Sequence, residues 1–155
     1  MSGNPVIRPA APADAPALAR LRLAFRAEVE PPSEDQPAFL ERCSAWMADR
    51  LESGGPWRAW VADTPAGIVG TAWLLLIEKL PNPVAEPEWH GYVSSLYVVP
   101  ERRGEGLGSA LLGRCVEECR RRAVDAIVLW PTPKSRPLYQ RHGFAVRDDL
   151  LQRRE

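Results

Sequence analysis

The sequence predicts a mixed α/β fold, with a central sheet of about six to seven strands flanked by about four helices. Runs rich in valine, isoleucine and aromatic residues, typical of strands, alternate with segments whose apolar residues recur at helical spacing. Two of the runs flank the sequence TPAG, which indicates a hairpin. Another leads into the glycine-rich stretch RRGEGLG and a further helical pattern, which indicates a strand, a turn and a helix in succession.

The composition fits a single domain over residues 1–155. Lys plus Arg and Asp plus Glu each number 20, so no general affinity for nucleic acid or membranes is expected. The N-terminus lacks a signal-peptide pattern, and the longest apolar run, TAWLLLI, is too short to span a bilayer. The cysteines Cys43, Cys115 and Cys119 have no metal-like partners and are expected in the core. These features favour a cytoplasmic protein without a bound metal.

Helix caps and chain breakers divide the first half of the chain. Asp14 is an N-cap followed by Pro16, and Asp35 is an N-cap followed by Pro37. The expected elements, in order, are a strand at 6–8, helices that begin after Asp14 and Asp35 and end before Pro31 and the SGGP break, and hairpin strands at 57–63 and 68–78. The proline-rich segment 79–91 is predicted to be a loop.

The second half alternates strands and helices. Residues 92–99 have the valine, tyrosine and leucine content of a strand, and apolar residues from Leu107 to Cys119 recur at helical spacing. Arg120–Arg122 supply cations at the negative end of that helix dipole, and Gly143 is a C′ glycine after a later short helix. The remaining expected elements are a strand at 126–130, a helix at 135–142 and strands at 144–147 and 150–154.

The turn RRGEGLG has the features of an anion site. Free N–H groups at a helix start and the positive end of the helix dipole point at the same spot. Gly104, Gly106 and Gly108 let a phosphate approach the backbone without an intervening Cβ. The forks of Arg102 and Arg103 suit phosphate oxygens. The turn therefore indicates a phosphate or pyrophosphate ligand, and a tight turn without a ligand is the alternative.

Two familiar phosphate-binding loops do not fit this turn. A P-loop needs a lysine after its last glycine, and no lysine follows Gly108. The dinucleotide fingerprint G-x-G-x-x-G/A needs a third small residue, but counted from Gly106 that place holds Leu111. Roughly a hundred residues also precede the turn, whereas the fingerprint normally opens its domain.

Two motifs resemble the GCN5-related N-acetyltransferases. RGEGLG is similar to that family's acyl-CoA-binding pattern Q/R-x-x-G-x-G/A, with Arg103 in the first place and Gly106 and Gly108 as the glycines. PLYQRHGF, residues 137–144, resembles the family's later signature, a short helix with a tyrosine followed by glycine and phenylalanine. The element order fits the whole chain, and the resemblance implies that the sheet is mostly antiparallel.

The resemblance implies that acetyl-CoA is the acyl donor. The binding residues that it implies are Leu96, Tyr97, Val98, Arg103, Gly104, Glu105, Gly106, Leu107, Gly108 and Ser109. The loop amides would hold the pyrophosphate, and the pantetheine arm would lie along residues 95–98. In the family this strand bulges and splays from the next one, so residues 95–98 are expected to pair only partly with 126–130. A backbone N–H near 96–98 would polarise the thioester carbonyl.

The resemblance also implies direct transfer of the acetyl group to a primary amine, with Tyr139 as the general acid that protonates the leaving thiolate. A phenol with a pKa of about 10 stays protonated at neutral pH. Many relatives carry a glutamate on the strand before the loop, but this chain has Ser94 and Ser95 there. The candidates for the base are His90, which titrates in the right range, and a water relay that includes Ser95.

The acceptor is expected to be a small-molecule or peptide amine. In the family, the region between the first two helices and the loop before the glycine strand shape the acceptor pocket. Here these segments hold Glu28, Glu30, Glu34, Asp35, Glu86, Glu88 and Trp89. An acidic, aromatic rim suits a cationic amine, and an ordinary solvated surface is the alternative. The resemblance also allows a homodimer.

Two other functions remain open from the sequence. The missing strand glutamate leaves a non-catalytic CoA-binding regulatory module of the same fold, although the retained Tyr139 argues against it. A dinucleotide-dependent oxidoreductase is disfavoured by the phase of the glycines. Release of free thiol from acetyl-CoA in the presence of amines separates the enzyme from the regulatory module.

Overall fold

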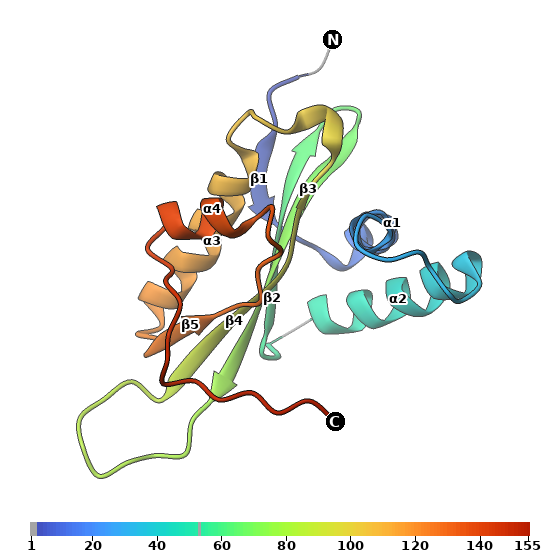
Figure 1. Ribbon diagram of the computed structural model, residues 1–155. Helices are drawn as coiled ribbons and strands as arrows, with labels where there is room; N and C mark the ends of the chain where they lie inside the picture. Colours follow the sequence, from blue (N-terminus) through green and yellow to red (C-terminus); the bar gives the residue numbers. More distant parts are fainter. Residues whose placement is uncertain (1–2, 53) are drawn as a thin grey trace.

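Residues 3–52 and 54–155, which the computed structural model describes, form a five-stranded sheet with helices against both faces (Figure 1). The strands are β1 (Val6–Pro9), β2 (Trp57–Thr64), β3 (Gly67–Glu78), β4 (Trp89–Val98) and β5 (Ala126–Val128). The α-helices are α1 (Ala15–Ala27), α2 (Gln36–Leu51), α3 (Leu107–Arg121) and α4 (Arg136–Arg141). Helices α1 and α2 cover one face of the sheet, and α3 and α4 cover the other.

The strands lie in the sheet in chain order, from β1 to β5. All neighbouring strands are antiparallel except β4 and β5, which are parallel and connected by the crossover helix α3. Strands β2 and β3 form the predicted hairpin, with Thr64 opposite Gly67. The predicted mixed, mostly antiparallel α/β fold is therefore confirmed.

The number of strands is lower than predicted, because segments 144–147 and 150–154 form no strand in the described part of the chain. Strand β5 is only three residues long and offers a short edge for a further partner. Val146 is 79% exposed and Leu151 is 94% exposed, so apart from Phe144, which packs against the core, the apolar side chains that suggested these strands are not buried. Their β-propensity alone does not supply the packing that stabilises a strand.

The two predicted N-caps behave differently. Asp35 Oδ2 accepts a hydrogen bond from the Ala38 N–H at 3.0 Å and caps α2 as predicted. Asp14 precedes α1, but its carboxylate binds Arg8 and the Ala11 N–H instead of an amide of that helix. This ion pair joins β1 to the start of α1 and uses the acceptor capacity that a cap would need.

The proline-rich segment is a loop only over residues 79–88, so the prediction that His90 lies in a loop is wrong. His90 lies in β4, opposite Ile77 of β3 and Ala126 of β5. Pro87 is the last proline of the segment, and every residue after it has an N–H that can join a strand ladder. Strand β4 therefore begins earlier than the proline content suggested.

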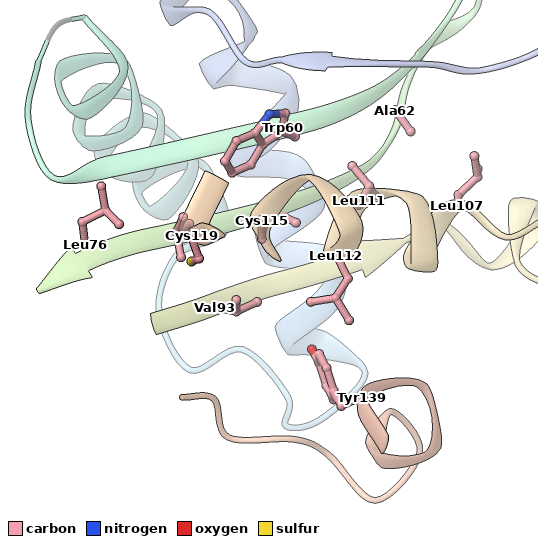
Figure 2. Packing of buried hydrophobic residues seen from close by; sticks show 12 residues of the cluster. Trp60, Ala62, Leu76, Val93, Leu107, Leu111, Leu112, Cys115, Cys119 and Tyr139 are labelled. Carbon is pink, nitrogen blue, oxygen red and sulfur yellow. The ribbon is translucent and has the colours of Figure 1, made fainter. Parts of the chain in front are cut away.

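Two apolar layers, one on each face of the sheet, form the core. Helix α3 buries Leu111, Leu112 and Cys115 completely against one face (Figure 2). Helix α1 buries Leu18 against the other face, near Trp73 of β3. Successive residues of a strand point to opposite faces, so the position of a residue in β4 decides which layer it enters.

Strand β4 carries a bulge near its end. Two of its residues, Ser95 and Leu96, stand opposite the single residue Ala72 of β3. Ser95 has a φ of +52°, in the left-handed region that non-glycine residues rarely adopt. A bulge interrupts the ladder and changes the direction of the strand, and such bulges are frequent beside functional sites. The sequence of β4 contains no glycine or proline at this point that would reveal it.

Strand β5 pairs over its whole length, Ala126–Val128, with His90–Tyr92 near the beginning of β4. The expectation that residues 95–98 pair with β5 is therefore wrong in register. Among the described residues, the part of β4 from 93 to 98 has β3 on one side and no strand on the other. Its open edge leaves backbone N–H and C=O groups free for another extended molecule.

Candidate functional site

A cleft of about 520 Å³ lies where the open part of β4 meets the glycine-rich turn. Nine of the ten residues predicted to bind the donor line it: Leu96, Tyr97, Val98, Arg103, Gly104, Gly106, Leu107, Gly108 and Ser109. The rest of its wall includes Glu28, which was predicted for the acceptor rim, and residues that the sequence did not reveal: Phe25, Thr132, Lys134, Ser135, Leu138 and Arg141. These residues come from the end of α1 and from the α4 region, and only the fold brings them to the turn.

The backbone N–H groups of residues 104–109 are free. Within 3–52 and 54–155, no protein acceptor binds any of them, and the first helical bond of α3 is Ala110 N–H to Gly106 O. Gly104 and Gly106 have φ values of +81° and +80°, which glycine adopts without steric cost. The turn thus directs unpaired amides into the cleft, as an anion site requires.

The two arginines of the turn are paired with carboxylates, so the predicted free positive charge is absent there. Arg102 donates hydrogen bonds to both carboxylate oxygens of Glu105, at 2.8 and 3.0 Å, and Glu105 does not line the cleft. Arg103 donates to both oxygens of Glu28, at 2.7 and 3.0 Å, and to the Val98 carbonyl at 3.0 Å. Both arginines therefore hold the turn in shape.

Lys134 and Arg141 supply positive charge to the cleft instead. Among the residues that the structure describes, neither forms an ion pair with a carboxylate, and both side chains are exposed. Ser109 Oγ lies 3.1 Å from His142 Nε2 and joins the start of α3 to the end of α4. The α4 region therefore supplies the cationic wall of the cleft.

Glu28 joins α1 to β4 on the wall of the cleft. The Tyr97 hydroxyl donates to Glu28 Oε1 at 2.8 Å, and the Tyr97 ring lies 5.5 Å from that of Phe25. Burial and the hydrogen bond to Glu28 raise the pKa of Tyr97 to about 12. Burial opposes ionisation of Glu28, but the hydrogen bonds from Tyr97 and Arg103 outweigh it and lower its pKa. The pair therefore stays hydrogen-bonded at neutral pH.

Tyr139 lies in α4, one residue after the cleft residue Leu138, and it is 8% exposed. Its ring packs edge-on against Phe144 at 5.7 Å, and its hydroxyl points towards Leu112 of α3 (Figure 2). It borders a second cavity, of about 280 Å³. Burial, and next the neighbouring Cys115, raise its pKa to about 12. Within residues 3–52 and 54–155 no hydrogen-bond partner holds its hydroxyl, so the proton remains available for donation.

The structure separates the two candidates for the base. Ser95 is at the bulge, and its Oγ is buried without a hydrogen-bond partner among the described residues. Neither residue lines the cleft, but Ser95 directly precedes the cleft residue Leu96, whereas His90 lies five residues from Ser95, or about 16 Å at 3.3 Å per strand residue. The Nδ1 atom of His90 is also buried and has no hydrogen-bond partner among the described residues. A buried polar atom without a partner is uncommon and indicates a place for water or a ligand.

The raised tyrosine pKa values predict a loss of stability at high pH. A tyrosine of the unfolded chain loses its proton near pH 10, whereas folded Tyr139 keeps its proton until about pH 12. Between these values the folded state binds more protons, so the free energy of unfolding falls as the pH rises. Tyr139 contributes a slope of at most about 1.4 kcal/mol per pH unit. Urea unfolding at pH 9, 10 and 11 measures it, and Tyr139→Phe should make the decline shallower; an equal slope in both proteins would contradict the assigned burial.

Three further properties of the described residues concern metal-ligating groups, the length and character of the helices, and the thiols. No group of three or more metal-ligating side chains occurs in the described ranges. None of the helices there combines the length and the apolar character needed to cross a bilayer. Burial raises the pKa of the Cys115 thiol, and it raises that of Cys119 to about 11, so both are overwhelmingly protonated at neutral pH.

Comparison with known proteins gives a consistent result. Residues 18–144 match the model of the family described as acetyltransferase (GNAT) family. The chain is 27% identical to a GCN5-related N-acetyltransferase from Ralstonia eutropha, with a TM-score of 0.79, covering 96% of this chain and 97% of that one. It is 24% identical to a predicted acetyltransferase from Clostridium acetobutylicum, crystallised with acetyl-CoA, with a TM-score of 0.80 and coverage of 99% and 96%. The similarity to the Ralstonia protein extends over nearly the whole chain, and the Clostridium protein has the same fold as this chain.

Proposed function

This chain belongs to the acetyltransferase (GNAT) family, and from that premise we propose that it transfers an acetyl group from acetyl-CoA to a primary amine by direct attack in a ternary complex. The observation that carries the proposal is the row of free amides at residues 104–109, in a cleft that also borders the open edge of β4. Amides at a helix start suit the pyrophosphate, and an open strand edge suits the amide-containing pantetheine arm. The whole chain would act as one acyl-CoA-binding domain.

The reaction needs groups at three positions. The amine nitrogen forms a bond to the thioester carbonyl carbon, the carbon–sulfur bond breaks, and sulfur leaves with the electron pair. An N–H from the stretch Leu96–Val98 would stabilise the negative charge that develops on the carbonyl oxygen. The bulge supports this role, because it interrupts pairing at Ser95 and Leu96 and turns β4 at the end of the cleft.

Tyr139 is proposed as the acid that gives a proton to the leaving sulfur. Its raised pKa keeps the phenol protonated at neutral pH, and its hydroxyl is engaged by no described residue. It belongs to the buried cluster that contains Val93 of β4 and Leu112 of α3, beside the opening between β4 and β5. A thiolate released in that opening would be close to the phenol.

The amine must lose a proton before it attacks. A primary amine with a pKa of about 10.4 is neutral in only about one molecule in a thousand near pH 7.4, which corresponds to roughly 4 kcal/mol. We propose a water relay through Ser94 and Ser95. Ser94 follows Val93 and points to the opposite face, the face that α1 covers, while Ser95 Oγ is buried without a partner in the described chain. His90 is less suited, because a base must reach its proton directly or through one water.

An acetyl-cysteine intermediate is not proposed. A nucleophilic cysteine needs a lowered pKa, whereas burial raises the pKa of Cys43, Cys115 and Cys119. Direct transfer therefore predicts intersecting lines in double-reciprocal plots of initial rates, and a covalent intermediate predicts parallel lines.

The deciding experiment combines binding with turnover. Purified protein is titrated with CoA by calorimetry and then incubated with acetyl-CoA and a panel of primary amines, with free thiol and acetylated amine both measured. We expect CoA binding, stoichiometric thiol and acetyl-amine, and intersecting initial-rate plots. Binding of CoA without transfer to any amine would instead support the non-catalytic CoA-binding module. Absence of CoA binding would overturn both functions.

The dinucleotide-dependent oxidoreductase does not fit this fold. A dinucleotide fingerprint lies in the first turn of a parallel βαβ sheet, whereas this glycine-rich turn follows β4 of a mostly antiparallel sheet. The family match points the same way.

A further inference from the structure

Half of the carboxylates in the acidic rim that favoured a cationic acceptor are paired with cations in the structure. Glu28 is bound by Arg103 and Tyr97. Glu34 pairs with Arg42 at 2.6 Å, and Asp35 caps α2. Glu86 lies 3.5 Å from Lys79 Nζ and also accepts a hydrogen bond from Asn82. Of the predicted rim carboxylates, Glu30 and Glu88 have no such partner among the described residues, and Asp35 is not paired with a cation, so the rim keeps only part of the negative charge that the sequence suggested.

One arginine stands out on the same side of the molecule. Seven arginines form no ion pair with a carboxylate in the described chain: Arg20, Arg22, Arg26, Arg120, Arg136, Arg141 and Arg154. Six of them are exposed to solvent, and Arg22 alone is partly buried. Removing a guanidinium from water without a counter-ion is costly, so a folded protein rarely keeps such a group without a use for it.

The position of Arg22 in α1 explains its burial. Ala15, Leu18 and Ala19 form the buried stripe of this helix, and Arg22 continues the stripe at the spacing of one face. Its guanidinium lies 5.7 Å from the centre of the Phe25 ring, and Phe25 lines the cleft. Arg22 itself does not line the cleft, so its side chain lies beside the cleft wall that Phe25 forms.

Among the residues that the structure describes, the charged and titratable groups around Arg22 include no carboxylate. Those close enough to influence it are Arg26 on its own helix, Cys43 of α2 and Tyr92 of β4. Burial is the main cause that lowers the pKa of Arg22, and the charge of Arg26 lowers it further. An anion at this point would relieve both unfavourable effects.

An open hollow lies beside Arg26, the exposed neighbour of Arg22. It is lined by Arg26, Trp130, Gln152, Arg154 and Glu155. Trp130 packs edge-on against Tyr92 at 5.2 Å, and Tyr92 precedes Val93 and so points to the α1 face of β4. Ser94 points to this same face, which is opposite the face that α3 covers. The single acidic member of the hollow, Glu155, pairs with Arg153.

We propose that Arg22 binds an anionic group of the acceptor, so that the preferred substrate is a primary amine that also carries a carboxylate or a phosphate. The inference rests on the proposed acetyl transfer and names the acceptor class for that site. The planar fork of arginine matches either anion with two parallel hydrogen bonds. Arg26 adds long-range attraction, and Tyr92 with Trp130 forms an apolar wall for the carbon chain between amine and anion.

The test uses acceptors in matched sets: an amino acid and its uncharged amide, an amine with a phosphate monoester and its alcohol, and a diamine. We expect kcat/KM to be at least about 10-fold higher for the anionic member of a pair, since hydrogen bonds to a charged group are worth that much or more. Comparison of the carboxylate and phosphate sets identifies the anion.

Arg22→Gln should remove that preference, with a rise in KM of about 10- to 100-fold for anionic acceptors and little change for neutral ones. Arg22→Lys should restore part of it, and the exposed Arg20→Gln on the same helix is the matched control. CoA affinity and thermal stability, measured on each variant, exclude a folding defect. Equal rates for charged and uncharged partners, or an equal loss for both in Arg22→Gln, overturns the inference while acetyl transfer stands. No transfer to any amine overturns the proposed function and the inference together.

Discussion

Replacing Tyr139 with phenylalanine is expected to lower kcat by about 10²- to 10⁴-fold and to leave CoA affinity near the wild-type value. The change removes only the hydroxyl, so the ring keeps its edge-on contact with Phe144 and its place under α3. What is lost is the proton donor for the leaving thiolate. Initial rates at saturating acetyl-CoA and calorimetric titration with CoA measure the two quantities separately.

A packing control distinguishes this chemical role from a structural one. Phe144→Leu disturbs the same aromatic pair without removing a hydroxyl, and it should change kcat by no more than a few-fold. Wild-type turnover in Tyr139→Phe would show that the phenol is only a core residue. A kcat loss of similar size in both variants, accompanied by a lower melting temperature, would point to the same conclusion.

The second large effect is expected from Gly108→Val. Gly108 lies on the wall of the cleft among the free amides, and its φ is outside the left-handed region, so the backbone can accept a side chain. A Cβ there would lie 3.4 Å from Leu138 Cδ2, an ordinary contact. The larger valine side chain would keep an anion away from the amides. Losing two charge-assisted hydrogen bonds of about 1.5–3 kcal/mol each should weaken CoA binding by at least about 100-fold.

The same helix provides the control for this substitution. Gly113 lies in the interior of α3 with open space where a Cβ would project, and it does not line the cleft. Gly113→Ala should leave CoA affinity unchanged and stabilise the helix by up to about 1 kcal/mol. Calorimetry and urea unfolding on both variants provide the comparison. Undiminished CoA affinity in Gly108→Val would mean that the anion binds elsewhere.

Local signals in the sequence predicted much of the fold. The cap Asp35, the turn between Thr64 and Gly67, and the glycine Gly143 at φ +86° after α4 each depend on a few neighbouring residues, and all lie where expected. The predicted strands at 144–147 and 150–154 are absent from the described part of the chain, because a short apolar run forms a strand only where a neighbouring strand pairs with it and its side chains are buried. His90 likewise joined β4 because two neighbouring strands were available to it.

The backbone conformation of the candidate site could be predicted from the sequence, but the pairing and burial of its side chains could not. The left-handed glycines at 104 and 106 can be read from residue types, because few other residues adopt that conformation cheaply. The pairing of Arg103 with Glu28 joins residues 75 positions apart, so no local pattern could reveal that the turn's charge is already used. The burial of Arg22 was equally hidden, since an arginine in an amphipathic helix ordinarily faces solvent.

The short pairing between β4 and β5 has a consequence for the stability of the protein when no ligand is bound. Three residue pairs join β5 to β4, and among the described residues no strand pairs with the edge of β4 beyond them. Acetyl-CoA lying along that edge would form the hydrogen bonds that a neighbouring strand would otherwise make. The thermal stability and protease resistance of the protein would then rise with the concentration of acetyl-CoA, and the protein would be degraded sooner in a cell where acetyl-CoA is scarce.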